Sequence, residues 1–320
     1  MKKKFTFGDF YSKAGNLLVL AAMFVFFSLM TPAFLRTSNL FNVLRQVSMI
    51  GIVSVGFTLL LISGGLDLSV GAQIAFIDVI IALMVKGGMP SWLAVIVGLI
   101  TTTLIGTVGG LIVVKASVPP MIVTFGISTA IRGIAYIISN AKPIYEVPDW
   151  IKYMGQGLVF GVIPTQVILM VIIIAIGVII LNKTYLGRYF CAVGSNTDAA
   201  RLCGISTDKI RVLSYSITGF LSGVAGVVMM GRVSSAQPSI ANGFEMDVLT
   251  AVVLGGVSIN GGRGSVLRAM VGVLIIGILT NGMSLIGLGD YWQQLVKGLI
   301  LIIVIVIDSF HTMREMKRLK

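Results

Sequence analysis

The sequence predicts an all-α protein that crosses a lipid bilayer many times, and three observations lead to this fold class. Of the 320 residues, 56% are hydrophobic and only 11% are charged, whereas soluble globular domains carry about a quarter charged residues. Uncharged runs such as 14–35, 87–114 and 153–181 reach the roughly 20 residues that a helix needs to span the hydrocarbon core. A transmembrane barrel would instead show short alternating segments, so these runs indicate helices.

The apolar runs divide the chain into about ten predicted spanning helices. They are expected at residues 15–35, 47–63, 66–85, 91–114, 121–140, 163–182, 212–231, 246–261, 267–287 and 291–309. The 38 glycines and eight prolines suit a bundle with broken helices and close helix contacts. We therefore expect one transmembrane domain that covers residues 1–320.

The distribution of basic residues predicts the orientation of these helices. Arg132 and Lys297 lie within predicted spans, and 16 of the 24 lysines and arginines fall on the side that carries both termini. The opposite side has six, namely Arg36, Arg45, Lys86, Lys142, Lys152 and Arg232. The positive-inside rule then places both termini in the cytoplasm. This bias also explains the net charge of +12, and because the basic residues are scattered over loops we expect no nucleic-acid partner.

A glycine-rich break precedes the third span. Gly64 and Gly65 are adjacent, and a helix broken at this point leaves backbone groups that must line a cavity or be buried in protein. Asp67 is expected either to cap the following helix or to line a transport pathway. Asp78 lies near the middle of the third span and should face the bundle interior, because an ionised carboxylate at mid-bilayer is costly unless it is paired or hydrated. Arg132 is a candidate partner.

A second glycine-rich break covers residues 255–265, with the sequence GGVSINGGRGS. It lacks the Gly-Lys-Ser/Thr ending of a P-loop, so we do not expect this chain to bind a nucleotide. The short stretches 65–68 and 245–248 each place an acidic residue just before a span. Those spans, the third and the eighth, run in opposite directions, which favours an inverted repeat.

Two polar segments separate the spans. Residues 141–163, which contain Pro143 and Pro148, are expected to form an outer loop, and residues 183–211 to form an inner loop. Within the inner loop, Ser195 and Asp198 match a capping box and Gly204 supplies a helix stop, so a short helix is predicted over Asn196–Cys203.

The spacing of this short helix places four small side chains on one face, namely Asn196, Ala199, Ala200 and Cys203. Asp198 and Arg201 lie elsewhere on the helix, at the rim of that face. The helix either lies on the protein's own inner surface or docks a soluble partner.

The chain lacks the residues that most enzymes and metal sites need. It has one histidine, His311, and two cysteines, Cys191 and Cys203, which are too few for a disulfide framework, a metal site or a catalytic set. We therefore expect no enzymatic activity, no cofactor and no bound metal.

Four stretches resemble the permease subunits of bacterial ABC importers for ribose and related monosaccharides. They are ISGGLDLSVGA at 62–72, PPMIVTFGISTAIRGIA at 119–135, YLGRYFCAVGSNTDAARLCGI at 185–205, and a C-terminal block at 231–265 that continues with YWQQLVKGLIL at 291–301. The similarity runs in the same order along nearly the whole chain.

The resemblance implies the ABC-importer permease fold in a bacterial inner membrane. It implies as partners a second permease subunit, identical or related, two cytoplasmic ATPase domains, a sugar-binding protein outside and the surrounding lipid. The segment that matches the family's coupling loop has these candidate ATPase-contacting residues: Gly187, Arg188, Gly194, Asn196, Ala199, Ala200, Arg201 and Gly204. Where Ser195 stands, the family usually has Gly, Asn or a similar small residue. The identity of the sugar stays open.

One alternative remains, an ion-coupled secondary transporter that uses intramembrane acids such as Asp67 and Asp78. The energy source separates the two hypotheses, since uptake by such a transporter would survive ATP depletion and stop when the ion gradient collapses.

Overall fold

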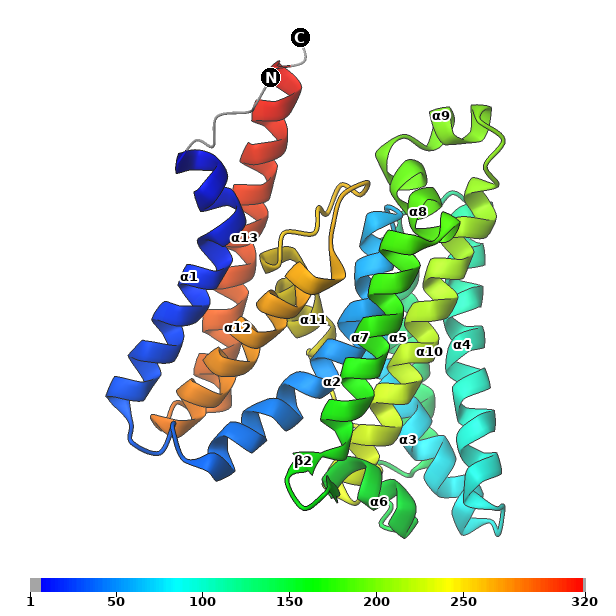
Figure 1. The fold of residues 1–320 in the computed structure, drawn as a ribbon. Helices are drawn as coiled ribbons and strands as arrows, with labels where there is room; N and C mark the ends of the chain where they lie inside the picture. Colours follow the sequence, from blue (N-terminus) through cyan, green and yellow to red (C-terminus); the bar gives the residue numbers. More distant parts are fainter. Residues whose placement is uncertain (1–6, 319–320) are drawn as a thin grey trace.

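The computed structural model describes residues 7–318, with side-chain surroundings for residues 15–306, and it is largely helical (Figure 1). Its long helices are α1 (Phe7–Met30), α2 (Thr37–Ile62), α3 (Val70–Lys86), α4 (Ser91–Lys115), α5 (Pro120–Ile138), α7 (Thr165–Lys183), α10 (Thr207–Val233), α12 (Val266–Leu285) and α13 (Asp290–Arg318). The shorter elements are α6 (Asp149–Gln156), the antiparallel strands β1 (Leu158–Val159) and β2 (Ile163–Pro164), α8 (Tyr185–Ser195), α9 (Thr197–Leu202) and α11 (Phe244–Leu254). The predicted all-α class is confirmed.

Six described helices are long and apolar enough to cross a membrane, namely α2, α4, α5, α7, α10 and α12. Each of the ten predicted ranges contains a helix, but the remaining four fall on α1, α3, α11 and α13. Helix α3 has 17 residues and α11 only 11, so neither alone has the roughly 20 residues of a full span. The predicted count of about ten crossings is therefore not confirmed.

Irregular backbone separates α2 from α3 at residues 63–69 and α10 from α11 at residues 234–243. Two predicted boundaries shift, because irregular backbone replaces predicted helix: α3 begins at Val70 rather than at 66, and α11 ends at Leu254 rather than at 261. The predicted outer loop at 141–163 connects α5 to α7 and contains two elements that the sequence did not predict, α6 and the β1–β2 hairpin. Helix α6 forms because Ile151 is buried and because Gly155 lets its backbone approach Gly231 of α10 with no room for a Cβ.

Helices α2 and α10 form the centre of the bundle. Helix α10 packs against α2, α3, α4 and α6, and α2 is buried along residues 47–62. Small residues bring the backbones together, since Gly106 of α4 meets Tyr215 and Gly219 of α10, and Gly56 of α2 meets Thr218. In lipid, where apolar burial drives little helix association, such close packing stabilises the bundle.

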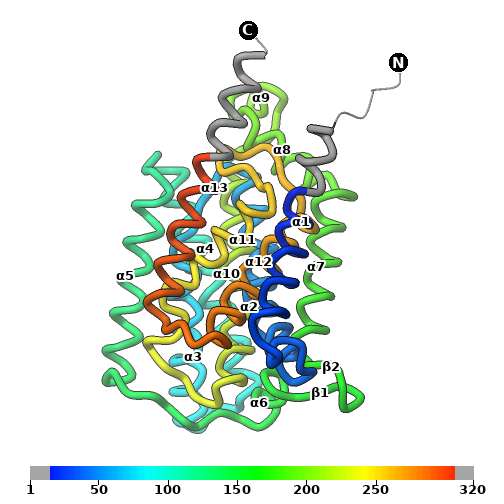
Figure 2. The backbone as a smooth tube through the Cα atoms, turned by 90° about the vertical axis from the view of Figure 1, so that its left-hand side faces the viewer, coloured from blue at the N-terminus to red at the C-terminus, as the bar shows by residue number. Residues whose placement is uncertain are grey.

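Helices α1, α12 and α13 lie on one side of this centre and α4 on the other (Figures 1 and 2). Helix α11 lies between the group of α1, α12 and α13 and the centre of the bundle, and it packs against α2, α12 and α13. The outer faces of α4, α5, α7 and α13 expose large apolar side chains, including Ile100, Ile137, Ile172 and Leu299. Such faces suit contact with lipid.

Candidate functional site

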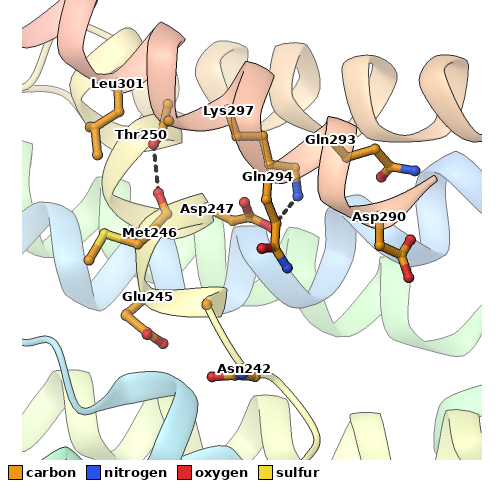
Figure 3. A pocket seen from close by; sticks show the side chains of 12 residues that line it. Asn242, Glu245, Met246, Asp247, Thr250, Asp290, Gln293, Gln294, Lys297 and Leu301 are labelled. Carbon is orange, nitrogen blue, oxygen red and sulfur yellow. Dashed lines mark hydrogen bonds and ion pairs between the residues drawn. The ribbon is translucent and has the colours of Figure 1, made fainter. Parts of the chain in front are cut away.

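A cavity of about 620 Å³ lies between α11 and α13 (Figure 3). Both helices place its lining residues at intervals of three and four positions, so one face of each helix forms a wall. The polar lining side chains are Asn242, Glu245, Asp247, Thr250, Asp290, Gln293, Gln294 and Lys297. The cavity thus contains a dense set of hydrogen-bonding groups within an otherwise apolar bundle.

An ion pair joins the two walls of the cavity. Lys297 Nζ lies 2.8 Å from Asp247 Oδ2, and the two side chains are only 18% and 21% exposed (Figure 3). Beside them, Glu245 Oε2 is buried with no hydrogen-bond partner among the described residues. Ammonium, carboxylate and amide groups together can donate to and accept from hydroxyl groups. This arrangement suits a solute that is rich in hydroxyl groups.

The segment 234–243 positions the first turn of α11 at this cavity. Arg132 of α5 donates from its guanidinium to the carbonyl oxygens of Pro238 and Ile240, both at 3.2 Å, and of Ala241 at 3.5 Å. Gly243, with φ of 77°, then turns the chain into α11. Backbone groups freed inside a membrane protein need such partners, so Arg132 stabilises the break.

The break at 63–69 is held in a corresponding way by α5 and α10. Tyr215 of α10 donates its hydroxyl to the Leu66 carbonyl at 3.2 Å and accepts from the Leu66 N–H at 3.3 Å. Thr124 of α5 accepts from the Leu68 N–H at 3.1 Å. Of the two predicted glycines, Gly65 is buried, whereas Gly64 is exposed and has a φ of 82° that favours glycine.

Asp67 is 1% exposed and belongs to this break. Its Oδ1 accepts from the Ser69 N–H at 2.8 Å and from the Ser69 hydroxyl at 2.6 Å, and its Oδ2 lies 3.4 Å from Gln73 Nε2. Asp67 does not line the cavity between α11 and α13. Asp67 thus holds Ser69, the residue before α3, but α3 has no side-chain cap hydrogen bond, so neither of the two expected roles of Asp67 is established.

Asp78 is fully buried in α3, and neither of its oxygens has a hydrogen-bond partner among the described residues. The candidate partner Arg132 contacts the 238–241 carbonyls instead. The predicted pairing is therefore absent from the described part of the chain. An isolated buried charge costs far more than a neutral carboxyl group, and the described part of the chain offers Asp78 no compensating group.

The segment 183–211 contains a helix that sequence reasoning missed, α8, before the predicted one. Gly187 packs against the Leu181 carbonyl, and Gly194 packs against the Ile62 carbonyl at the end of α2 and against Gly262, with no room for a Cβ at either position. Gly262 also donates its N–H to the Ile62 carbonyl at 2.8 Å. Gly194 is thus a contact within the chain, whereas Arg188 is exposed.

The predicted short helix is present as α9 but with a different cap. Asn196, not Ser195, is the N-cap, and its side-chain oxygen accepts from the Ala199 N–H at 2.9 Å. Ser195 cannot cap α9 because it is the last residue of α8. The predicted stop is confirmed, since Gly204 follows the helix with a φ of 80°.

The predicted small face of α9 is divided between two surroundings. Ala200 is buried against the protein, whereas Asn196, Ala199 and Cys203 are exposed. Leu202 is 90% exposed at the end of the helix, although an unpartnered leucine favours burial. Arg201 lies 3.6 Å from Asp208, close to the start of α10. Helix α9 therefore rests on Ala200 and presents an exposed surface that includes Ala199 and Leu202.

The cavity residues were not predicted as a site, although a signal existed. Lys297 falls within a predicted span and Asp247 at the start of another, and charged residues in such places indicate function. Their 50-residue separation hid the pairing, which depends on how α11 and α13 pack.

Among the described residues, no group of three or more His, Cys, Asp or Glu side chains is arranged to hold a metal ion. Cys191 and Cys203 are both free thiols, and burial raises the pKa of Cys191. His311 lies outside the residues whose side chains are described.

Comparison with known proteins gives a consistent set of relatives. The family described as the permease component of branched-chain amino acid transport systems matches residues 39–305. The chain is similar to the ribose import permease protein of Bacillus subtilis (strain 168), with 36% identity over 309 residues, which are 96% of each chain. No solved structure matches the chain with statistical significance.

Two further relatives come from Escherichia coli (strain K12). Its ribose import permease protein is 37% identical over 298 residues, which are 92% of each chain. Its L-arabinose transport system permease protein is 33% identical over 309 residues, covering 97% of this chain and 94% of the relative.

Proposed function

The chain belongs to this family of permease components, in the branch that contains the ribose import permeases, and from that premise we propose that it forms the pathway of an ATP-driven importer for ribose or a related monosaccharide. It is a multi-pass inner-membrane transport component and not an enzyme. Family membership implies ATPase and binding-protein components as partners. A second permease subunit, identical or related, would complete the assembly.

The cavity between α11 and α13 is the proposed sugar-facing surface. Its amides, carboxylates and single ammonium group can replace the water around a neutral, hydroxyl-rich molecule. It lies beside α13, whose outer face exposes Leu295 and Leu299. A second permease subunit packed there would enclose the cavity along a shared axis.

Helix α9 carries the proposal of ATPase coupling. A capped six-residue helix held by Ala200 presents Ala199 and a nearly fully exposed Leu202. Burial of one leucine side chain stabilises an interface by about 2 kcal/mol. The segment 183–211 would thus dock on the ATPase, with Asn196, Ala199 and Leu202 at the contact and with Gly187, Gly194 and Gly204 shaping the backbone.

We place α9 and both termini in the cytoplasm, since this orientation obeys the positive-inside rule. Ten crossings follow if α1, α3, α11 and α13 cross the membrane together with the six long helices. In that case the short helices α3 and α11 complete their crossings with the irregular segments next to them. The arrangements α2–break–α3 and α10–break–α11 correspond, which supports an inverted repeat.

The proposed docking through α9 is tested with two exposed apolar residues that lie on opposite sides of the membrane. We expect Leu202→Glu to lower the yield of ATPase co-purified with the permease, and sugar uptake, by about tenfold, the equivalent of 1.4 kcal/mol. Phe160→Glu is the matched control, since Phe160 is 93% exposed in the β1–β2 turn and should leave ATPase yield unchanged. Unchanged ATPase yield and uptake with Leu202→Glu would refute docking through α9.

The same uptake assay distinguishes the ion-coupled alternative. ATP depletion should stop uptake, while a protonophore applied with ATP maintained should not. The opposite pattern would favour a secondary transporter and overturn the proposed energy source.

A further inference from the structure

A continuous groove follows the outer face of α10 between α4 and α7. Figure 1 shows α4 and α7 on either side of α10. Three hollows of about 440, 380 and 300 Å³ make up the groove. The first two share Leu213 and Ser216, and the last two share Thr103 and Phe220. The hollows therefore form one path along the helix axis.

The walls of this groove are apolar over most of its length. Ile173, Ile176 and Ile180 of α7 face Leu213, Ile217 and Phe220 of α10 across the middle hollow. The hydroxyl groups present are already used within the chain. Thr103 donates to the Leu99 carbonyl at 2.7 Å, and the Ser216 hydroxyl lies 2.7 Å from that of Thr107. A linear hydrocarbon chain matches a groove with no unused polar group.

The end of the groove next to α9 is basic. Lys115 and Lys209 line it together with Asp208, and Arg201 lies 3.6 Å from that carboxylate. Three cations thus surround one acidic group. The Lys115 side chain is 73% exposed and lies 3.7 Å from Asp208, while no hydrogen bond or ion pair joins the Lys209 side chain to another described residue. An anionic group can therefore bind at this end without breaking an internal contact of Lys209.

We propose that this groove binds an anionic phospholipid, with an acyl chain along α10 and its phosphate at Lys115 and Lys209. Basic pockets between spanning helices on the cytoplasmic side bind such headgroups. A second copy of the chain fits less well. A two-fold axis normal to the membrane would place the same lysines opposite each other at equal depth, and this like-charge contact would oppose association.

The test is native mass spectrometry of the full-length permease released from vesicles that contain equal amounts of phosphatidylglycerol and phosphatidylcholine with the same acyl chains. The wild type should retain phosphatidylglycerol preferentially. Lys209→Gln should lower that retention about fivefold, because one basic side chain near an anionic lipid contributes about 1 kcal/mol. Arg268→Gln is the matched control, since it removes an exposed cation from the same side of the molecule, at the start of α12.

Leu213→Phe tests the acyl-chain part of the site, because it narrows the groove where two hollows meet. It should lower retention of both lipids. Equal retention of the two lipids by the wild type, or equal losses with Lys209→Gln and Arg268→Gln, would overturn the proposal. Undiminished retention with a folded Leu213→Phe variant would also overturn it. Lys209 is exposed, so its variant keeps the test decisive even if Leu213→Phe does not fold.

Discussion

The two buried aspartates of the α2–α3 region differ in their surroundings. Asp67 accepts hydrogen bonds from the Ser69 backbone and hydroxyl, whereas Asp78 has no partner among the described residues. An ionised carboxylate without partners in a buried site lacks compensation for the cost of its burial. The sequence placed Asp67 beside a glycine-rich break and Asp78 near the middle of a span, and the packing around them shows which of the two has hydrogen-bond partners.

Asp78→Asn should therefore leave function nearly intact. An amide resembles a neutral carboxyl group in shape and charge, so we expect sugar uptake within about twofold of wild type, or about 0.4 kcal/mol. Asp67→Asn is the comparison, since it disturbs the hydrogen bonds to Ser69 and should lower thermal stability. A loss of uptake, or a changed pH dependence of uptake, in Asp78→Asn would show that Asp78 takes part in proton movement.

The Asp247–Lys297 pair permits a separation of stability from transport. Lys297→Met leaves a largely buried carboxylate unpaired, and we expect it to lower the free energy of unfolding by about 2 kcal/mol. The double variant Asp247→Asn/Lys297→Met removes both charges and should recover most of that stability in thermal unfolding. Sugar uptake should stay reduced in the double variant if the cavity is the pathway. Full uptake by the double variant would place the pathway elsewhere.

At the scale of elements, α9 shows both the reach and the limit of local sequence rules. The helix and its stop at Gly204 were predictable, because a cap followed by glycine has a local physical cause. The identity of the cap was not, because Ser195 is already the last residue of α8. Helix α8 itself depends on tertiary packing, since Phe190 and Val193 are buried in the main core.

Asn196→Ala should fray α9, because loss of an N-cap side chain costs about 1 kcal/mol and the helix has only six residues. Hydrogen exchange at the Ala199 amide should become faster, and ATPase co-purification should decrease. Ser195→Ala is the control and should change neither, since Ser195 does not cap α9. Equal effects of the two substitutions would contradict the assigned cap.

The two breaks were predictable to different degrees. Gly64 and Gly65 indicated the first directly. The second, at 234–243, has its local signal in Gly243, while its main support, Arg132, lies over 100 positions away in the sequence. A long-range hydrogen bond of this kind leaves no periodic pattern in the sequence. The predicted span at 246–261 extended past the end of α11 at Leu254 into residues 255–265, which their glycine content already marked as a break.

At the scale of the whole molecule, hydropathy predicted ten ranges, and a helix is present in each of them. Hydropathy succeeds here because lipid forces backbone groups to pair within each helix. It did not identify which helices would meet. The cavity arises only where α11 and α13 face each other, and composition carries no information about that contact. The basic end of the α4–α7–α10 groove likewise combines Lys115 and Lys209 from distant parts of the chain.

The orientation is tested by labelling single cysteines in a Cys191→Ala/Cys203→Ala background. Asp198→Cys on α9 should react with a membrane-impermeant maleimide only after the inner face is opened. Glu146→Cys, exposed on the opposite side before α6, should react in intact cells. The reverse pattern would invert the topology and with it the proposed side of ATPase docking.

The meeting of Gly194, Gly262 and the end of α2 has a mechanical consequence. At Gly194 main chain touches main chain, because its nearest neighbours are the Ile62 carbonyl and the Gly262 N–H. Side chains can accommodate small displacements by changing rotamer. A contact between backbone atoms cannot adjust in this way. A displacement of α9 would thus move the break before α3 by nearly the same amount. Gly194, which has no side chain, thus provides a rigid contact between the α8–α9 segment and the end of α2.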